Sequence, residues 1–198
     1  VGLMAVGVSL GGNVLLKWMG ETGARIPEGF RGSVAISVPF DLEACARTID
    51  EGWNRAVYGA SFLRTMRAKV RAKARTFPGF VDVEGACRAR TFAEYDRIVT
   101  APLGGFADEV DYWTRSSAGR YLGEIRRPTL LISALDDPIV PPRSLPVRAS
   151  LPAGVKLEVQ EHGGHVGFLH GPPWAPRSWA ETRAVEFLSG CIPERYRP

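Results

Sequence analysis

The sequence predicts an α/β fold in which a mostly parallel sheet is flanked by helices. Short apolar runs that suit buried strands alternate with segments that suit helices, and this alternation favours parallel pairing with helices on both faces. Polar or glycine-rich turns follow several of these runs, where parallel strands would share one edge of the sheet. A long insert with helical spacing interrupts the alternation.

The elements outside the insert follow in chain order. The expected strands are Leu3–Val8, Gly32–Val38, Pro128–Ser133 and Lys156–Gln160. The expected helices are Leu10–Met19, a helical connection near Arg143–Ser150, and Ser178–Leu188. Glu21–Arg31 is polar and rich in turn formers, which indicates a connection, and Pro39 ends the second strand because proline lacks a backbone donor.

The insert covers about Asp41–Leu122, and residues 1–40 and 123–198 form the core of a single domain. Its clearest helix is Asn54–Arg75, in which Tyr58, Phe62, Met66 and Val70 recur every four residues as one apolar stripe. Its aromatic side chains either line an apolar pocket or pack the insert against itself. They are Trp53, Phe77, Phe80, Phe92, Phe106, Tyr112 and Trp113.

Ser9 lies at the apex of a predicted strand, turn and helix in the run VGVSLGGN, Val6–Asn13. Gly7 and Gly11 lack a Cβ, so two backbone segments can crowd around Ser9 and hold it in a strained turn. A helix beginning at Leu10 would direct unpaired N–H groups and its positive dipole end at this site. The pattern favours an activated nucleophile, with the Leu10 N–H stabilising an oxyanion, over an ordinary N-cap serine.

A serine nucleophile needs a base and an orienting acid, which follow in the order Ser, Asp, His in this architecture. Asp136 and Asp137 follow the third strand, and His165 lies in a glycine-rich turn after the fourth. We therefore predict Ser9 as the nucleophile, His165 as general base and then acid, and Asp137 as the carboxylate that orients the imidazole. Asp136 is the alternative acid.

Several stretches of the chain resemble the carboxy-terminal part of the YheT-type α/β-hydrolase family. They are VGVSLGGN at Val6–Asn13, SVPFDLEAC at Ser37–Cys45, ADEVDYW at Ala107–Trp113, PTLLISALDDPIVP at Pro128–Pro141 and EHGGHVGF at Glu161–Phe168. The resemblance implies an α/β-hydrolase fold with a helical cap over the mouth of the site, and carboxylic-ester or related acyl substrates. It also implies Ser9 and His165 as catalytic residues, and it favours Asp137 over Asp136 because Pro138-Ile139-Val140-Pro141 follows.

The resemblance also implies that the chain is an amino-terminally truncated domain. The serine turn of this family normally follows the fifth strand of an eight-stranded sheet, whereas here only Val1–Ala5 precede the motif. The loop that normally gives the second oxyanion N–H would then lie outside the chain, which leaves Leu10 as the donor. Leu3–Val8 would become an apolar sheet edge, which favours aggregation or strand-to-strand pairing.

Composition bounds the other classes of function. A chain of 198 residues with a hydrophobic share of 45% and a net charge of +4 fits one globular domain, with no run near the roughly 20 residues of a membrane helix. Cys45, Cys87 and Cys191 have no disulfide or zinc spacing, and a cytoplasmic location is expected. His162, His165 and His170 lack a familiar zinc spacing. The basic run Arg64–Arg75 is interpreted as a solvated helix face that permits transient contact with a membrane surface, without nucleic-acid binding.

The predicted function is hydrolysis of small-molecule carboxylic esters through an acyl-enzyme, without cofactor or metal. One alternative is a catalytically silent fragment or non-enzymatic partner domain, because an oxyanion donor would be missing. Another is an acyltransferase that uses the same three residues with an alcohol in place of water.

Overall fold

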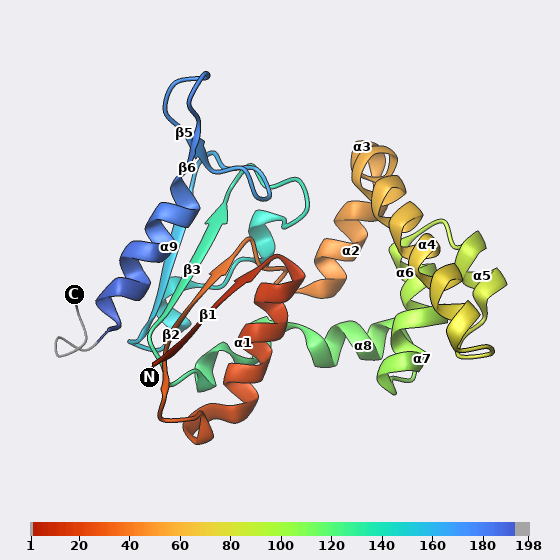
Figure 1. The fold of residues 1–198 in the computed structure, drawn as a ribbon, viewed down its shortest axis with the longest axis horizontal. Coiled ribbons are helices and arrows are strands. Elements are labelled where there is room, and N and C mark those ends of the chain that lie inside the picture. The colour runs from red at the N-terminus through yellow and green to blue at the C-terminus, as the bar shows by residue number, and fades with distance from the viewer. Residues whose placement is uncertain (1, 193–198) are drawn as a thin grey trace. The chain divides into compact units, whose positions relative to one another are not determined.

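The computed structural model describes residues 2–192 and divides them into two compact units (Figure 1). The first unit, which we call the sheet unit, contains residues up to Phe40 and from Ser117 onward. The second, which we call the helical unit, is Asp41–Ser116. The sequence placed the end of the insert at about Leu122, but Ala118 and Leu122 are buried in the core of the sheet unit.

The sheet unit is built on four parallel strands in the order β1-β2-β3-β4, which confirms the predicted α/β fold. They are β1 (Leu3–Val8), β2 (Phe30–Ile36), β3 (Thr129–Ala134) and β4 (Val155–Gln160). The predicted bounds of β1 agree with the structure. The second strand begins and ends two residues earlier than Gly32–Val38, because the chain turns at Ser37, whose φ is 51°.

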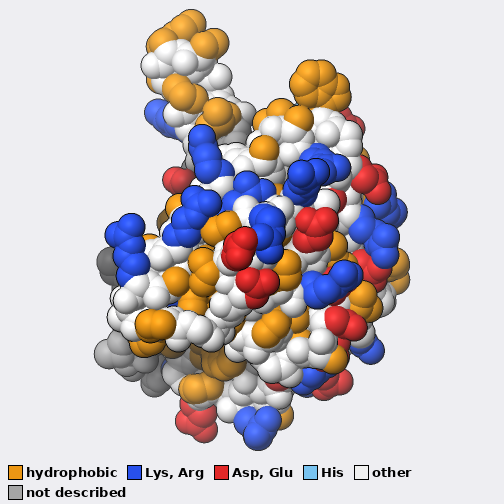
Figure 2. Space-filling model, turned by 90° about the vertical axis from the view of Figure 1, so that its right-hand side faces the viewer, with side chains coloured by type: hydrophobic (Ala, Val, Ile, Leu, Met, Phe, Trp, Pro, Cys, Tyr) orange, Lys and Arg blue, Asp and Glu red, His pale blue; other side chains and the backbone are white. Residues whose placement is uncertain are grey.

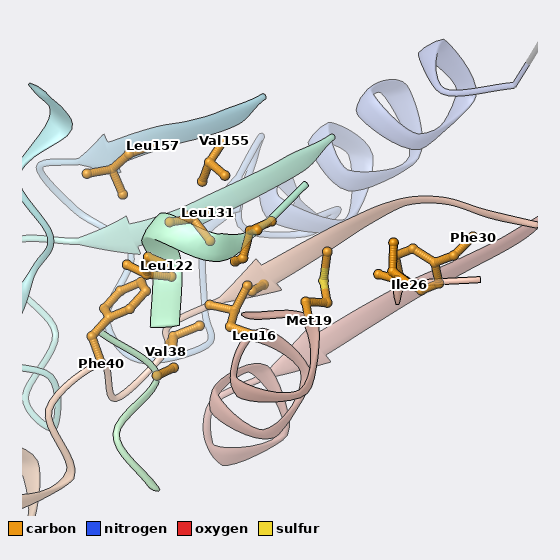
Figure 3. Packing of buried hydrophobic residues seen from close by; sticks show 13 residues of the cluster. Leu16, Met19, Ile26, Phe30, Val38, Phe40, Leu122, Leu131, Val155 and Leu157 are labelled. Atoms are coloured by element: carbon orange, nitrogen blue, oxygen red, sulfur yellow. The ribbon is translucent and has the colours of Figure 1, made fainter. Parts of the chain in front are cut away.

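Two helices cover opposite faces of this sheet (Figure 1). Leu16 and Met19 of α1 (Leu10–Thr22) pack with Ala35, Leu131 and Leu157 on one face, as Figure 3 shows for the labelled members. Ala180 and Ala184 of α9 (Trp179–Gly190) pack with four strand residues on the other face: Val34, Ile36, Leu130 and Ile132. Adjacent strand residues alternate between the two cores, as the pleat of a doubly covered sheet requires.

The connections between these elements are short 3₁₀ turns, at Gly23–Arg25, Ala118–Glu124, Pro142–Ser144 and Arg148–Ser150. The helical connection predicted near Arg143–Ser150 is present only as two separate 3₁₀ turns. Pro141, Pro142 and Pro146 remove backbone donors along this stretch, so a continuous helix does not form. Beyond β4, Leu169–His170 (β5) and Arg177–Ser178 (β6) form a small antiparallel pair before α9, whose N-cap is Ser178.

The helical unit consists of short helices joined by tight turns. Its helices are α2 (Leu42–Asp50), α3 (Gly52–Asn54), α4 (Ala60–Thr76), α5 (Val83–Arg88), α6 (Phe92–Tyr95), α7 (Ala101–Gly104) and α8 (Glu109–Ser116). Two π-helical turns, Arg55–Gly59 and Asp96–Thr100, continue α3 into α4 and α6 into α7. Side chains cap three of the helices: Asp41 on α2, Asp82 on α5 and Thr91 on α6.

The buried stripe of α4 differs from the predicted one. Val70 of the predicted stripe is buried and Met66 packs against the same core, but Leu63 is buried there as well, whereas Phe62 is 41% exposed. An α-helix has about 3.6 residues per turn, so a strict step of four drifts around its axis and leaves the buried face. The aromatic side chains of the insert were expected either to line a pocket or to pack the insert against itself. Phe80, Phe92 and Trp113 pack in the cores of the helical unit, whereas Trp53 and Phe77 are exposed.

Asp96 is a buried carboxyl group in the helical unit. It accepts hydrogen bonds from Trp113 Nε1 at 2.9 Å and from Thr100 Oγ1 at 2.6 Å. Burial raises the pKa of Asp96 above its ordinary value, although both hydrogen bonds oppose the shift. These bonds link α8 to the π-helical turn after α6.

The basic residues of α4 lie among other side-chain types. Arg64, Arg71 and Arg75 are exposed, while Arg67 is partly buried. On the face shown in Figure 2, Lys and Arg side chains are interspersed with acidic and apolar ones. Across residues 2–192, no helix combines the length and the apolar character needed to cross a membrane. Cys45, Cys87 and Cys191 are free thiols.

Candidate active site

Ser9 lies between the end of β1 and the first residue of α1, with φ 51° and ψ −125°. Its backbone N–H donates to Ile36 O at 2.8 Å, and its carbonyl accepts from Gly12 N and Asn13 N. These bonds fix the turn on both sides, in a backbone region that non-glycine residues rarely adopt. The strained serine turn predicted from the sequence is present.

Two glycines allow this turn: Gly7, as predicted, and Gly12 in place of the predicted Gly11. A Cβ on Gly7 would lie 2.7 Å from Gly11 O and from Gly12 Cα, and a Cβ on Gly12 would lie 2.7 Å from Val38 Cγ2. A Cβ on Gly11 would meet nothing within 4 Å. The close approach therefore depends on Gly7 and Gly12, because the start of α1 passes directly over the end of β1.

His165 joins Ser9 to Asp137. Its Nε2 lies 2.8 Å from Ser9 Oγ, and its Nδ1 lies 2.9 Å from Asp137 Oδ2. The network is consistent with a neutral imidazole that donates Nδ1–H to the carboxylate and accepts the serine hydroxyl proton at Nε2. The structure thus brings together the three side chains that the sequence selected from the ends of β1, β3 and β4.

Asp137 is held as a buried carboxylate, with its side chain 1% exposed. Its Oδ1 accepts from Ile139 N at 2.8 Å and from Val140 N at 3.0 Å, in the turn that follows β3. Together with His165 Nδ1, these donors offset the cost of burying the charge. The imidazole therefore faces a carboxylate whose position is set by the backbone.

Asp136, the alternative acid, points to a different partner. Its Oδ1 accepts from Gly163 N at 2.9 Å and Gly164 N at 2.8 Å, and its Oδ2 lies 3.5 Å from His162 Nδ1. The bond from Gly164 N is the largest cause that lowers the pKa of Asp136 below its ordinary 3.8, so the carboxylate stays ionised near neutral pH. Asp136 thus holds the start of the loop that carries His165.

The His165 loop is a tight turn that packs on the sheet unit. Gly164 has φ 58°, and Gly163 O accepts from Gly167 N and from Phe168 N. Phe168 is buried in the core beneath α9. The loop is therefore fixed at both ends, by Asp136 and by the Phe168 side chain, and His165 lies between them.

Leu10 is the first residue of α1, so its backbone N–H has no acceptor within the helix. It follows Ser9 directly, where the helix dipole favours negative charge.

Sequence reasoning missed Asn13, which is buried and whose Oδ1 accepts from Ala118 N at 2.8 Å. Asn13 ties the helix behind Ser9 to the 3₁₀ turn that precedes β3. The signal available in the sequence was a polar residue at the end of VGVSLGGN, on the helix expected behind Ser9.

The other histidines are not part of this arrangement. The His162 side chain is 88% exposed, and His170 is an exposed residue of β5. Among residues 2–192, no group of three or more His, Cys, Asp or Glu side chains is placed to hold a metal ion.

Comparison with known proteins agrees with this fold. Residues 3–172 match the family described as alpha/beta hydrolase fold, and the chain belongs to that family. It is 37% identical over 187 residues to YheT of Escherichia coli (strain K12), which covers 93% of this chain and 54% of that protein. It is 28% identical over 169 residues to phospholipase ABHD3 of Bos taurus, covering 85% of this chain and 41% of that protein.

Among solved structures, the chain resembles a monoacylglycerol lipase of Paleococcus ferrophilus. The TM-score is 0.49 at 20% identity, covering 95% of this chain and 68% of that structure. The chain spans about half the length of the curated relatives described above.

Proposed function

We propose that this chain carries the catalytic residues of a serine hydrolase that acts on carboxylic esters. The observation that supports the proposal most directly is the hydrogen-bonded series Ser9 Oγ, His165 Nε2, His165 Nδ1 and Asp137, at 2.8 and 2.9 Å. Serine hydrolases on unrelated folds are recognised by this geometry and these roles. Membership of the α/β hydrolase family and a relative named as a phospholipase add support.

In the proposed mechanism, Ser9 Oγ attacks the acyl carbonyl while its proton passes to His165 Nε2. Asp137 stabilises the imidazolium, and the Leu10 N–H donates to the oxyanion. The imidazolium then protonates the leaving alkoxide as the C–O bond breaks, which leaves an acyl group on Ser9. His165 next takes a proton from water, and the resulting hydroxide attacks the acyl carbon. The bond from the acyl carbon to Ser9 Oγ then breaks, the imidazolium returns its proton to Oγ, and the acid is released.

Serine-directed labelling provides the first test. A fluorophosphonate probe should label the 198-residue chain, and Ser9→Ala should abolish the labelling. Ser37→Ala is the matched control, because Ser37 has the same φ of 51° but its buried Oγ has no hydrogen-bond partner among the described residues. Labelling that persists in Ser9→Ala would remove the proposed nucleophile, and an unlabelled wild-type chain would favour the silent alternative.

Turnover provides the second test. With p-nitrophenyl esters of short acyl chains, Ser9→Ala should lower kcat/KM by at least about a thousandfold, because the nucleophile and its base act as a unit. Ser37→Ala should retain turnover. Product analysis in the presence of an added alcohol separates hydrolysis from acyl transfer, since hydrolysis yields the free acid as the main product.

A further inference from the structure

The helical unit contains a hollow with several arginines in its wall. Its volume is about 390 Å³, within the range of small-molecule sites. We call it the arginine hollow, and its lining residues are Gly52, Arg55, Ala56, Ala60, Leu63, Arg67 and Arg90. It lies wholly within Asp41–Ser116 and contains none of the residues of the candidate active site.

The three arginines come from three different segments. Arg55 begins the π-helical turn before α4, Arg67 lies on α4, and Arg90 precedes α6. The side chain of one arginine and the backbone of another are held by hydrogen bonds. Arg67 Nη2 donates to Ala89 O, and the backbone N–H of Arg90 donates to Glu94 Oε2 at 2.6 Å. Arg67 Nε is buried without a hydrogen-bond partner among the described residues. The fold therefore gathers guanidinium groups here without using all of their donors.

The carboxylates near the hollow are largely occupied by backbone N–H groups. Asp50 interacts electrostatically with Arg55, but both of its oxygens accept from Phe92 N, at 2.8 and 2.9 Å, and burial raises its pKa. Within residues 2–192, the side chains of Arg55 and Arg90 form no ion pair. Arg55 and Arg90 are exposed residues and Arg67 is partly buried, so the guanidinium groups of Arg55 and Arg90 are open to an anion at the hollow.

We propose that the arginine hollow binds a phosphate monoester. Three arginines that line one hollow suit a group with three terminal oxygens and up to two negative charges, and arginine binds such oxygens through paired N–H donors. Ala56, Ala60 and the buried Leu63 supply an apolar wall for the organic part of the ligand. Soluble phosphate esters and the phosphatidic acid headgroup share this chemistry. The inference does not depend on ester hydrolysis.

Calorimetric titration with glycerol 3-phosphate tests the soluble source, and flotation with phosphatidylcholine vesicles containing phosphatidic acid tests the lipid source. The pocket variant is Arg55→Gln with Arg90→Gln. The matched control is Arg64→Gln with Arg71→Gln, which removes the same charge from exposed positions of α4 outside the hollow. We expect the pocket variant to bind at least about tenfold more weakly, a change of about 1.4 kcal/mol, with the control close to wild type. Circular dichroism checks that both variants fold.

Each outcome is decisive. Loss of glycerol 3-phosphate binding in the pocket variant alone supports the site with a soluble ligand, and loss of vesicle binding in that variant alone supports it with a lipid ligand. Equal loss in both variants would mean that net charge, rather than the hollow, attracts the ligand, and would overturn the proposal. Failure of the wild-type chain to bind either probe would overturn it as well.

Discussion

At Ser9 the backbone conformation and the side-chain contact depend on each other. A φ of 51° costs on the order of 1–3 kcal/mol for a non-glycine residue, so the surrounding bonds must hold it there. The bond from Ser9 N to Ile36 O and the bonds from Gly12 N and Asn13 N to Ser9 O do so. In this conformation, Ser9 Oγ lies 2.8 Å from His165 Nε2. The strain therefore coincides with the atom that the proposed chemistry uses.

The two adjacent aspartates in the turn after β3 contact different partners. Asp137 contacts the imidazole, and Asp136 contacts the backbone of Gly163 and Gly164. The sequence favoured Asp137 through the residues that follow it, but it could not assign a partner to Asp136. That partner is a turn 27 and 28 residues further along the chain, and it becomes a neighbour only after β3 and β4 pair.

Asp136→Ala should loosen the His165 loop without removing any group of the proposed triad. The variant deletes the acceptor of the Gly163 and Gly164 amides, so their hydrogen exchange should become faster than in wild type. Mass spectrometry of peptides covering residues 161–168 measures the change. Because backbone donors lower the pKa of Asp136 below 3.8, the anchoring should persist above about pH 4 and weaken only as the pH falls through the lowered pKa.

Glu161→Ala is the matched control for this prediction. Glu161 is an exposed carboxylate beside the same loop and forms no hydrogen bond or ion pair within the described part of the chain. It should leave the exchange rates of the loop unchanged. Equal acceleration in both variants would show that removing a nearby charge, rather than the Asp136 hydrogen bonds, governs the motion.

At the scale of elements, the close approach of the β1 and α1 backbones determines which positions of the β1–turn–α1 segment must be glycine. The motif VGVSLGGN indicated crowding, yet it could not say which glycines meet a neighbour. Gly12 is required because Val38, from the connection after β2, lies against it, and this contact exists only in the folded sheet unit. Gly11 faces open space.

Glycine-to-alanine substitutions separate these roles. Gly11→Ala should stabilise the chain by about 0.4–1 kcal/mol, since α1 can accommodate the Cβ and alanine reduces the entropy of the unfolded state. Gly7→Ala should destabilise it by more than about 1 kcal/mol, because its Cβ would meet backbone atoms at 2.7 Å. Urea unfolding followed by circular dichroism measures both. A destabilising Gly11→Ala or a neutral Gly7→Ala would contradict the assigned packing.

Other elements show where sequence patterns lose information. The strands were predictable because Leu3–Val8 and Pro128–Ser133 are predominantly apolar, as in a sheet covered on both faces. The segment Arg143–Ser150 has polar and apolar residues at helical spacing, but its prolines prevent the backbone hydrogen bonds. In α4 the predicted stripe was right in part: Met66 and Val70 pack in the core of the helical unit, but Leu63 is buried there and Phe62 is exposed, since the side that packs is set by the other helices of the unit.

At the scale of the whole molecule, the site was predictable because parallel strands end at one edge of the sheet. Ser9, Asp137 and His165 all follow strands, so a correct strand assignment brings them together. The arginine hollow was not predictable in the same way. Arg55, Arg67 and Arg90 are spread over the helical unit, and the basic run around Arg67 suggested only a solvated face.

The sheet unit exposes apolar side chains along β1, which lies at one end of the strand order. Leu3, Val6 and Val8 are 62%, 52% and 45% exposed. Edge strands with apolar side chains favour pairing with another chain, because both backbone groups and apolar surface are available. We therefore expect the 198-residue chain to self-associate as its concentration rises.

Val6→Lys should weaken that self-association, because a charged side chain in the middle of an edge strand opposes strand pairing. Val185→Lys is the matched control, since Val185 is 66% exposed on α9 and the substitution adds the same charge. Sedimentation velocity over a range of concentrations should show larger species for wild type and Val185→Lys, and mainly monomer for Val6→Lys. If both lysine variants dissociate equally, net charge governs the association. If wild type remains monomeric at all concentrations, the β1 edge does not mediate self-association.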